Sequence, residues 1–481
     1  MASATLPEFP YFVGSRRTST GEALEVRACF DDHPVARTFR PTPEAVEDAL
    51  TATAAAAGRC AALPTYERAR ILRAMAEAVD SRREDFVRML ALEAGKPVKA
   101  GRVEVERCVF NLTNASEEAK RIGAEYFPLD LFPAASGRWA LVRRFPLGTI
   151  LAITPFNFPL NLVAHKVAPA IAAGNSVVQK PATKTPICSL MLAECAYEAG
   201  LPDDALSVLP CSGSRAGELA RDERFALLTF TGSAAVGWGL KASARRQRVT
   251  LELGGNAGVI VCPDADLEDA ARRCAAGGFS YAGQSCISVQ RILVARSVFD
   301  SFSRHLVDAV GRLRVGDPLL DETDVGPLIT LDDAKRVEAW IEEARRDGAR
   351  ILTGGQRDGA LVSPTVLSGT KASMKVNCEE VFGPVVTVEP YDSLDQAFAR
   401  VNDSRYGLQA GIFTRDLPAA FKAFELLEVG GVVVNDVPTF RADHMPYGGT
   451  KDSGLGREGA RYAIEEMTER KVLVLNLAAG S

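Results

Sequence analysis

Hydrophobic positions in the first part of the chain recur at helical spacing. Within residues 66–92 the recurring apolar side chains are Leu72, Met75, Val79, Phe86 and Leu90. This spacing predicts a helix with one apolar face, and the following Gly95-Lys96-Pro97 is typical of a helix end. We expect a second helical stretch from there to about residue 122.

From about residue 148, short β-rich runs alternate with helix-like segments. The runs comprise residues 149–153, 176–180, 206–209, 227–230 and 249–253, and then residues 258–261, 291–295, 350–354, 384–389, 410–414 and 431–435. Such alternation predicts parallel sheets covered by helices. The predicted fold class is therefore α/β, with two domains in tandem and a break near Gly254-Gly255. Residues 126–145, rich in Pro and aromatic side chains, are expected to form an arm or a linker.

Composition narrows the class of protein. The 481 residues allow two or three domains, and 47% hydrophobic residues, 24% charged residues and a net charge of −5 describe an ordinary soluble globular protein. A mildly acidic chain without a basic block is a poor candidate for binding nucleic acid. We expect no signal peptide. Prolines and polar residues interrupt the apolar segment 148–178, so we expect a buried core there and no membrane span.

The cysteines are scattered, and one of them has an unusual setting. The ten show no C-x-x-C pair and no ligand-like spacing to the four histidines, which argues against zinc or a disulfide framework. We expect no metal and a reducing, cytoplasmic location. Nine of them are expected to be small buried hydrophobic residues. Cys286 follows Gly283, Gln284 and Ser285 in FSYAGQSCISVQR, where small neighbours and backbone N–H groups suit a nucleophile and a developing oxyanion.

Two polar residues follow strand-like runs and are candidates for proton transfer and oxyanion binding. Glu252, in LELGGNAGVIV, ends an apolar strand before two glycines. Partial burial would raise its pKa toward that of a general base, although a glutamate that caps a turn is the alternative. Asn157, in ITPFNFPLN, follows a strand at the end where open α/β sheets bind ligands. Its amide could donate to an oxyanion or satisfy its own turn.

Three further segments suit a phosphate-containing cofactor. Gly232 and Ser233, in FTGSAAVG, would expose backbone N–H groups at a helix start, which suits a pyrophosphate. Lys180, in QKPATKTP, and Glu380 and Phe382, in EEVFGP, lie in turns after β-like runs. Turn formation alone would also explain these last two segments.

Taken together, these stretches resemble the aldehyde dehydrogenase superfamily. The matching motifs span roughly residues 140–470 in the family's order: TPFNFP, KPA, FTGS, ELGG, GQSC, EEVFGP and PYGGTKDSGLGREG. The resemblance implies an aldehyde dehydrogenase fold with two Rossmann-like α/β domains and a small β oligomerisation arm. Residues 1–125 and 146–253 would form the NAD(P)-binding domain, residues 254–445 the catalytic domain, and residues 126–145 and 465–481 the arm.

The resemblance also implies a mechanism. Cys286 would attack the aldehyde carbon to give a thiohemiacetal, with Asn157 and the Cys286 backbone N–H as the oxyanion hole. Hydride would pass to NAD(P)+ and leave a thioester, and Glu252 would activate the water that hydrolyses it to the carboxylic acid. Lys166 and Glu458 match positions that relay protons from Glu252.

For the cofactor, Lys180 would contact the adenosine ribose, Glu380 the nicotinamide ribose, and Phe382 the nicotinamide ring. The full implied set is Ile153, Thr154, Pro155, Lys180, Thr183, Gly213, Gly217, Phe230, Gly232, Ser233, Glu252, Leu253, Gly254, Glu380 and Phe382. Members that prefer NAD often carry Glu where this chain has Thr183. Without that carboxylate nothing repels a 2′-phosphate, so we expect NADP+ to be used and leave NAD+ open. Arg215 is a candidate partner for the phosphate, or a solvated surface residue.

The positions that match the family's substrate tunnel are polar here: Arg107, Asn161, His165, Ser285, Arg441 and His444. Two arginines facing one tunnel would select a carboxylate, phosphate or phosphonate, unless they form structural ion pairs. Some phosphate-handling relatives carry a basic residue at Ser285, so its absence favours semialdehydes or small hydroxyaldehydes such as lactaldehyde. FRADHMPYGG is similar to the lactaldehyde and phosphonoacetaldehyde dehydrogenase branches, and Arg107 to an arginine of non-phosphorylating glyceraldehyde-3-phosphate dehydrogenases.

Three alternative functions make different demands on the residues of the site. A CoA-acylating semialdehyde dehydrogenase would lack the general base at Glu252, a non-catalytic relative would have lost Cys286 or Glu252, and a thiol esterase would not need the cofactor residues. The small-molecule partner is therefore an aldehyde.

The run ERKVLVLNL, residues 469–477, is a candidate edge strand that would pair with a neighbouring arm, so we expect a homodimer or homotetramer.

Overall fold

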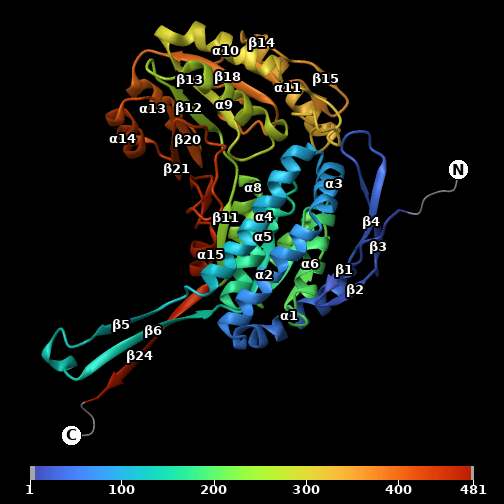
Figure 1. The fold of residues 1–481 in the computed structure, drawn as a ribbon, viewed down its shortest axis with the longest axis vertical. Helices are drawn as coiled ribbons and strands as arrows, with labels where there is room; N and C mark the ends of the chain where they lie inside the picture. Colours follow the sequence, from blue (N-terminus) through green and yellow to red (C-terminus); the bar gives the residue numbers. More distant parts are fainter. Residues whose placement is uncertain (1–5, 478–481) are drawn as a thin grey trace.

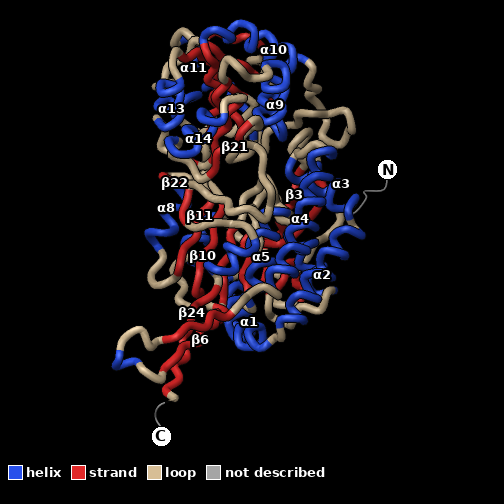
Figure 2. Tube along the Cα trace, turned by 60° about the vertical axis from the view of Figure 1, so that its left-hand side comes forward, coloured by secondary structure: helices blue, strands red, loops and turns tan. Residues whose placement is uncertain are grey.

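The computed structural model describes residues 6–477, which form two α/β lobes and a projecting arm (Figure 1). In Figure 2, where strands are red, each lobe has strands at its centre and helices on either side. The α/β class predicted from the sequence is confirmed. Within residues 6–477, no helix combines the length and the apolar character that crossing a membrane requires.

An eight-stranded sheet forms the centre of the first lobe. Its order is β2-β1-β9-β8-β7-β10-β11-β23, and the strands from β9 to β11 run parallel. The strands are β1 Tyr11–Val13, β2 Arg16–Thr18, β7 Thr149–Ile153, β8 Ser176–Lys180, β9 Leu206–Val208, β10 Phe225–Thr231, β11 Arg248–Glu252 and β23 Gly454–Leu455. The strands β7 and β8 are buried along their whole length, which explains their continuous apolar runs.

A seven-stranded sheet forms the centre of the second lobe. Its order is β14-β17-β18-β13-β12-β20-β21, parallel from β17 to β21 with β14 antiparallel at the edge. The strands are β12 Ala257–Val261, β13 Val289–Ala295, β14 Arg350–Thr353, β17 Thr365–Ser368, β18 Val385–Tyr391, β20 Gln409–Phe413 and β21 Gly431–Val434. Only four residues, Leu253, Gly254, Gly255 and Asn256, separate this sheet from β11 of the first lobe.

Helices cover both sheets. The first lobe has α1 Pro43–Ala62, α2 Thr65–Ser81, α3 Arg83–Ala94, α4 Val98–Ala119, α5 Asn161–Ala173, α6 Ile187–Glu198, α7 Gly213–Leu219, α8 Ala234–Ser243 and α15 Ala460–Glu466. The second has α9 Leu267–Phe279, α10 Phe299–Gly311, α11 Leu331–Arg346, α12 Lys375–Cys378, α13 Leu394–Asn402 and α14 Leu417–Leu426. The single helix expected over residues 66–92 is wrong: the chain leaves helical geometry at Arg82 (φ −108°, ψ 22°), whose guanidinium bonds Glu194 of α6 at 2.8 Å.

The shorter elements complete the description. Antiparallel pairs are β3 Glu22–Arg27 with β4 Pro34–Arg40, β15 Arg357–Asp358 with β16 Leu361–Val362, and β19 Tyr406–Gly407 with β22 Thr450–Lys451. Single 3-10 turns cover Pro133–Ala135, Ser280–Gly283 and Arg296–Val298.

The arm is a three-stranded antiparallel sheet that projects from the first lobe (Figure 1). It comprises β5 Ala124–Pro128, β6 Arg138–Pro146 and the C-terminal strand β24 Thr468–Asn476. All nine residues of β24 pair with β6 of the same chain, from Thr468 opposite Pro146 to Asn476 opposite Arg138. Residues 478–481 of the expected arm and residues 1–5 of the expected first domain lie outside the described residues. The functional division into domains stays a prediction.

Candidate active site

A cavity of about 500 Å³ lies where the first sheet's strands end and the chain enters the second sheet. The loops after β7 and β10 contribute Asn157, Gly232 and Ser233 to its wall, and the end of β11 contributes Glu252. Cys286 enters from the turn that precedes β13. The cavity therefore brings together residues that are far apart in the sequence, at the edge where open α/β sheets bind ligands.

Fifteen of the candidate residues line this cavity, and the others lie outside its wall. Those that line it are Arg107, Pro155, Asn157, Asn161, Gly232, Ser233, Glu252, Leu253, Gly254, Ser285, Cys286, Glu380, Phe382, Arg441 and Glu458. Those outside it are Ile153, Thr154, His165, Lys166, Lys180, Thr183, Gly213, Gly217, Phe230 and His444. His444 is exposed, with its ring centroid 5.8 Å from that of Phe110.

The turn before Cys286 holds three successive residues in the left-handed region: Tyr281 (φ 51°), Ala282 (φ 54°) and Gly283 (φ 70°). Left-handed geometry is unfavourable for residues other than glycine. At Gly283 a Cβ atom would lie 2.2 Å from the carbonyl oxygen of Gly383, so only glycine fits. The turn thus directs Cys286 into the cavity.

The Cys286 thiol is half-buried, and its Sγ lies 3.1 Å from the hydroxyl oxygen of Tyr447. Burial raises the pKa of the thiol to about 12, while the hydrogen bond with Tyr447 and the charge of Arg441 oppose that rise. At neutral pH the resting group is therefore a thiol, and it needs a base to become the nucleophilic thiolate.

Glu252 is a buried carboxyl group whose Oε2 has no hydrogen-bond partner among the described residues. Burial raises its pKa well above that of an ordinary glutamate, and the nearby charge of Glu458 raises it further. Arg441 and Lys166 act in the opposite direction without reversing the shift. A carboxyl group in this state can exchange a proton with a bound water.

Asn157 is anchored beside the cysteine. Its buried amide Nδ2 donates to the backbone carbonyl of Gln284 at 2.9 Å. Gln284 is itself fixed, because its Oε1 accepts from the backbone N–H of Ile329 at 2.9 Å. An amide nitrogen carries two hydrogens, so one N–H of Asn157 remains for an oxygen held next to Cys286.

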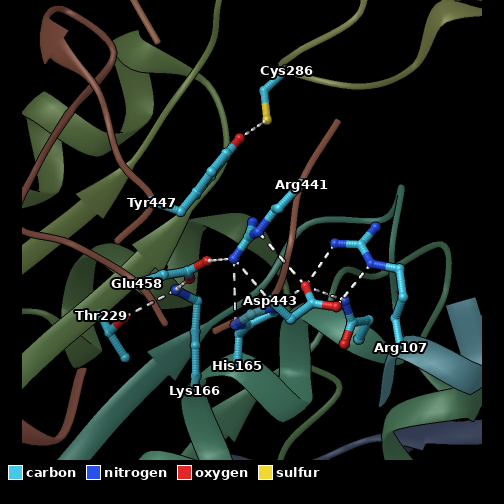
Figure 3. Close-up of polar contacts among 10 residues, drawn as sticks. Arg107, His165, Lys166, Thr229, Cys286, Arg441, Asp443, Tyr447 and Glu458 are labelled. Atoms are coloured by element: carbon cyan, nitrogen blue, oxygen red, sulfur yellow. Dashed lines mark hydrogen bonds and ion pairs between the residues drawn. The ribbon is translucent and has the colours of Figure 1, made fainter. Parts of the chain in front are cut away.

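Five charged side chains at the cavity, three of them in its wall, form what we call the charge cluster: Arg107, Lys166, Arg441, Asp443 and Glu458 (Figure 3). Lys166 donates to Glu458 at 3.1 Å and to Thr229 at 2.9 Å. Arg441 donates to the other oxygen of Glu458 at 2.9 Å. Burial alone would raise the pKa of Glu458, but Lys166 and Arg441 outweigh it and lower the pKa to about 2.

The other half of the charge cluster is centred on Asp443. Arg107 binds it through two parallel hydrogen bonds of 2.9 and 2.7 Å, a strong bidentate geometry. His165 bonds the same carboxylate at 2.8 Å, and the Asn161 amide is 3.4 Å away. Against the effect of burial, His165 and Arg107 hold the pKa of Asp443 below its usual range. Burial and the nearby Arg441 lower the pKa of His165, which favours the neutral imidazole.

The residues expected to bind a dinucleotide fit one. Ser233 precedes α8 without capping it through its side chain, which leaves backbone N–H groups at a helix N-terminus for an anion. Glu380 accepts from the backbone N–H of Gly255 at 2.9 Å, and burial raises its pKa to about 7. The buried Lys180 donates to the Pro181 carbonyl at 3.0 Å, and burial lowers its pKa.

Three further residues considered for the cofactor make contacts of their own: Thr183, Phe382 and Arg215. Thr183 donates to the carbonyl of Cys211 at 3.4 Å. Phe382 lies edge-on to Phe156, with ring centroids 5.8 Å apart. Arg215, considered for a 2′-phosphate, forms an ion pair with Glu218 of its own helix.

Two residues at the site were not identified from the sequence. Tyr447 lies within the quoted motif PYGGTKDSGLGREG, but no spacing rule shows that its hydroxyl reaches Cys286. Asp443 lies between Arg441 and His444 in the sequence, but its burial and its ion pair with Arg107 are apparent only in the fold.

Comparison with known proteins identifies the family of the chain. The family model of the aldehyde dehydrogenase family matches residues 16–473. A 3-sulfolactaldehyde dehydrogenase of Priestia aryabhattai is 46% identical over 479 residues, covering 99% of this chain and 100% of the relative. The crystal structure of aldehyde dehydrogenase 21 from Physcomitrella patens in complex with the reaction product succinate is 42% identical, with a TM-score of 0.97, covering 99% and 100% of the two chains.

A third comparison concerns the cofactor. The crystal structure of glyceraldehyde-3-phosphate dehydrogenase GapN from Methanocaldococcus jannaschii complexed with NADP is 38% identical, with a TM-score of 0.91, covering 94% of this chain and 99% of that chain. The chain belongs to the aldehyde dehydrogenase family and has its fold, as the sequence predicted. Its reaction is the NAD(P)-dependent oxidation of an aldehyde.

Proposed function

We propose that the substrate is a small aldehyde with one anionic group at its far end, a carboxylate or a sulfonate. The observation that carries this proposal is the composition of the charge cluster. It contains three cations, Arg107, Lys166 and Arg441, against two carboxylates whose pKa values are lowered. The cluster therefore has an excess of one positive charge beside the cavity, which a monoanion would neutralise.

Arg107 is the better placed of the two cavity arginines for such a group. It uses Nε and Nη2 on Asp443, which leaves Nη1 for a ligand, and its side chain is 26% exposed. Arg441 is almost fully buried. Ser285 adds no charge beside Cys286, so a dianionic phosphate would be less well neutralised. The names of two similar proteins support this substrate class. One is a 3-sulfolactaldehyde dehydrogenase, and the other is a structure in complex with the reaction product succinate, so each name includes a compound with an acidic group away from the reacting carbon.

The chemistry proceeds on Cys286. Its sulfur attacks the aldehyde carbon, the carbonyl electron pair moves to oxygen, and the free N–H of Asn157 stabilises that oxyanion. Bound NAD(P)+ supplies the hydride acceptor. Glu252 then takes a proton from the water that attacks the resulting thioester, and the acid leaves as the Cys286 sulfur is released. Glu458 and Lys166 hold the charge balance around Glu252 during this transfer.

The cofactor proposal is use of NADP+, with NAD+ accepted less well. Thr183 offers a hydroxyl where a carboxylate would repel a 2′-phosphate. The relative of known structure that is complexed with NADP supports this choice.

Assembly and location complete the proposal. We infer a homo-oligomer from the exposed apolar side chains of the arm: Tyr126, Leu131, Phe132, Val472, Leu473 and Val474. A cytoplasmic location is supported by the cysteines, all ten of which are free thiols.

The test is formation of reduced cofactor by the purified protein with NADP+ and NAD+. The aldehydes are 3-sulfolactaldehyde, succinic semialdehyde, glyceraldehyde 3-phosphate, lactaldehyde and an aliphatic aldehyde. We expect the highest kcat/KM with one of the first two, and a roughly tenfold rise of KM for that substrate in Arg107→Gln, with KM for lactaldehyde unchanged. Equal kcat/KM for charged and uncharged aldehydes would contradict the proposed substrate class.

The roles of the two catalytic groups are tested separately. Cys286→Ala should abolish turnover while cofactor binding, followed by fluorescence, persists. Glu252→Gln should release one burst of reduced cofactor and then turn over slowly, because thioester hydrolysis is blocked. Retained turnover in Cys286→Ala would place the nucleophile elsewhere, and loss of the burst in Glu252→Gln would give Glu252 an earlier role.

A further inference from the structure

A tyrosine hydroxyl is in direct contact with the thiol. The Oη of Tyr447 lies 3.1 Å from the Sγ of Cys286, a distance at which either group can donate to the other (Figure 3). Tyr447 belongs to a small apolar cluster with Ile287 and Leu408, and the half-buried Cys286 packs against this cluster. Tyr447 is itself buried and lines the cavity.

An arginine lies against the same tyrosine ring. The guanidinium carbon of Arg441 is 3.7 Å from the ring centroid of Tyr447, a close cation–π contact. Glu458 holds this guanidinium at 2.9 Å, and His165 lies 3.1 Å from it. A fixed positive charge on the face of a phenol draws electron density from the ring and makes its O–H a stronger donor.

We propose that Tyr447 is a catalytic residue that donates a hydrogen bond to the Cys286 thiolate, and that Arg441 is the positioning residue that holds and polarises it. This inference rests on the proposed role of Cys286 as the nucleophile. It assigns to Arg441 a function in thiol chemistry that is distinct from recognition of the substrate's charge.

Two protons are involved in the contact between Cys286 and Tyr447, one on the thiol and one on the phenol. Burial raises the pKa values of both the Cys286 thiol and the Tyr447 phenol, so both keep their protons at rest. When the thiol proton passes to a base, Glu252 or water, the electron pair stays on sulfur and the phenol O–H turns to donate to it. The same bond stabilises the sulfur when it leaves during thioester hydrolysis.

Other charged groups also shift the pKa values of Cys286 and Tyr447. Arg441 lowers the pKa values of both the thiol and the phenol, whereas Glu252 raises both of them. Glu380 raises the pKa of the thiol from the cofactor side of the cavity. Among these groups, only Tyr447 forms a hydrogen bond with the Cys286 sulfur within residues 6–477.

The test measures the thiol directly, without cofactor or substrate. Iodoacetamide alkylation of Cys286 is followed by peptide mass spectrometry between about pH 7 and about pH 10. Tyr447→Phe keeps the ring and the cation–π contact but removes the hydroxyl, and we expect Cys286 to react about three- to tenfold more slowly at each pH. The expected loss of thiolate is partly offset by its greater intrinsic nucleophilicity. The exposed Cys378 serves as a reference in the same sample.

A matched control removes a different buried tyrosine hydroxyl. Tyr391 donates to the Val261 carbonyl at 3.3 Å in the second sheet, and Tyr391→Phe should leave the Cys286 rate unchanged. Equal slowing in Tyr391→Phe, or an unchanged or faster rate in Tyr447→Phe, would overturn the proposal.

Arg441→Lys tests the positioning role, because lysine keeps the charge but loses the flat stacking surface. We expect an intermediate slowing of Cys286 alkylation. A rate equal to that of the unmodified protein would remove Arg441 from the proposal and leave Tyr447. Because alkylation does not depend on turnover, these outcomes are independent of those obtained with Cys286→Ala in the activity assay.

Discussion

Glu252 and Glu458 carry the same side chain, line the same cavity and have pKa values shifted in opposite directions. Burial dominates at Glu252 and raises its pKa, whereas at Glu458 the contacts with Lys166 and Arg441 outweigh burial and lower it. When the pKa values of two neighbouring acids are moved apart, their roles separate. Glu252 is suited to accept and release a proton, and Glu458 is suited to remain a fixed anion.

The opposite pKa shifts of Glu252 and Glu458 predict how kcat depends on pH in Glu458→Gln. In the proposed mechanism thioester hydrolysis requires ionised Glu252, so its rate should rise with pH through the raised pKa of that group. In Glu458→Gln the like charge is lost, and Lys166 and Arg441 then act more strongly on Glu252, so its pKa should fall. We expect the acid limb of kcat to move down by about one pH unit. Glu465→Gln, at an exposed position of helix α15, is the control.

If the acid limb of kcat stays in place or moves to higher pH in Glu458→Gln, Glu252 does not control thioester hydrolysis. The measurement is kcat from about pH 5 to about pH 9 with saturating aldehyde and cofactor.

The sequence predicted that three of the candidate residues would lie near one another. Cys286, Glu252 and Asn157 line one cavity because each follows or precedes a strand of a predictable sheet. The contact between Tyr447 and Cys286 could not be predicted, because it joins segments about 160 residues apart through packing alone. The same holds for the pairing of Arg107 with Asp443, which decides how much of that arginine is left for a ligand.

At the scale of elements, α4 holds the loop that carries Asn157. Glu104 of α4 is fully buried and accepts from the backbone N–H groups of Leu160 and Asn161 at 3.0 and 3.1 Å, at the start of α5. It also forms an ion pair with the buried Lys96, whose ammonium lies 3.6 Å from the ring centroid of Phe158. One carboxylate therefore satisfies a helix terminus and a buried cation at the same time.

Removing one partner of the Glu104–Lys96 ion pair should lower the stability of the fold strongly, and replacing both partners should lower it less. Glu104→Gln leaves the Lys96 charge buried without its counterion, and we expect a loss of about 3–5 kcal/mol of stability. The double variant Glu104→Gln with Lys96→Met removes the charge as well and should recover a large part of that loss. Thermal unfolding followed by circular dichroism compares the three proteins. A melting temperature of Glu104→Gln equal to that of the unmodified chain would refute this account.

The sequence predicted most elements of both central sheets, because their buried strands are continuous apolar runs between turns. It did not predict the hairpins β1–β2 and β3–β4 or helix α1, since these have mixed composition and depend on contacts with other elements. The break at Arg82 was missed for a related reason: the apolar spacing continues across it, and the side chain's bond to α6 is tertiary.

At the scale of the whole molecule, the arm exposes a group of large apolar side chains. Its β24 strand places Val472, Leu473 and Val474 at about half exposure, and the tip places Leu131 at 86% and Phe132 at 61% exposure. Exposed apolar surface of this kind marks an interface. We therefore expect the arm to be covered by another copy of the chain.

The prediction for assembly uses charge on one face of β24. Residues 472 and 474 share a face, since side chains alternate along a strand. Val472→Lys with Val474→Lys should lower the mass in solution toward that of the 51.5 kDa chain, measured by light scattering after size exclusion. Tyr66→Lys, at a 68% exposed position of α2, should leave the mass unchanged. An unaltered mass in the double variant would place the interface away from this face.

The pairing of β24 with β6 also has a consequence for synthesis of the chain. Strand β6 ends at Pro146 and its partner begins at Thr468, about 320 residues later. At roughly 5–20 residues per second, the ribosome needs on the order of tens of seconds to deliver that partner. During this interval β6 has one open edge, a template for pairing with other nascent chains. Completion of the arm is thus a late, post-translational event, and chains released early would lack the strand that closes it.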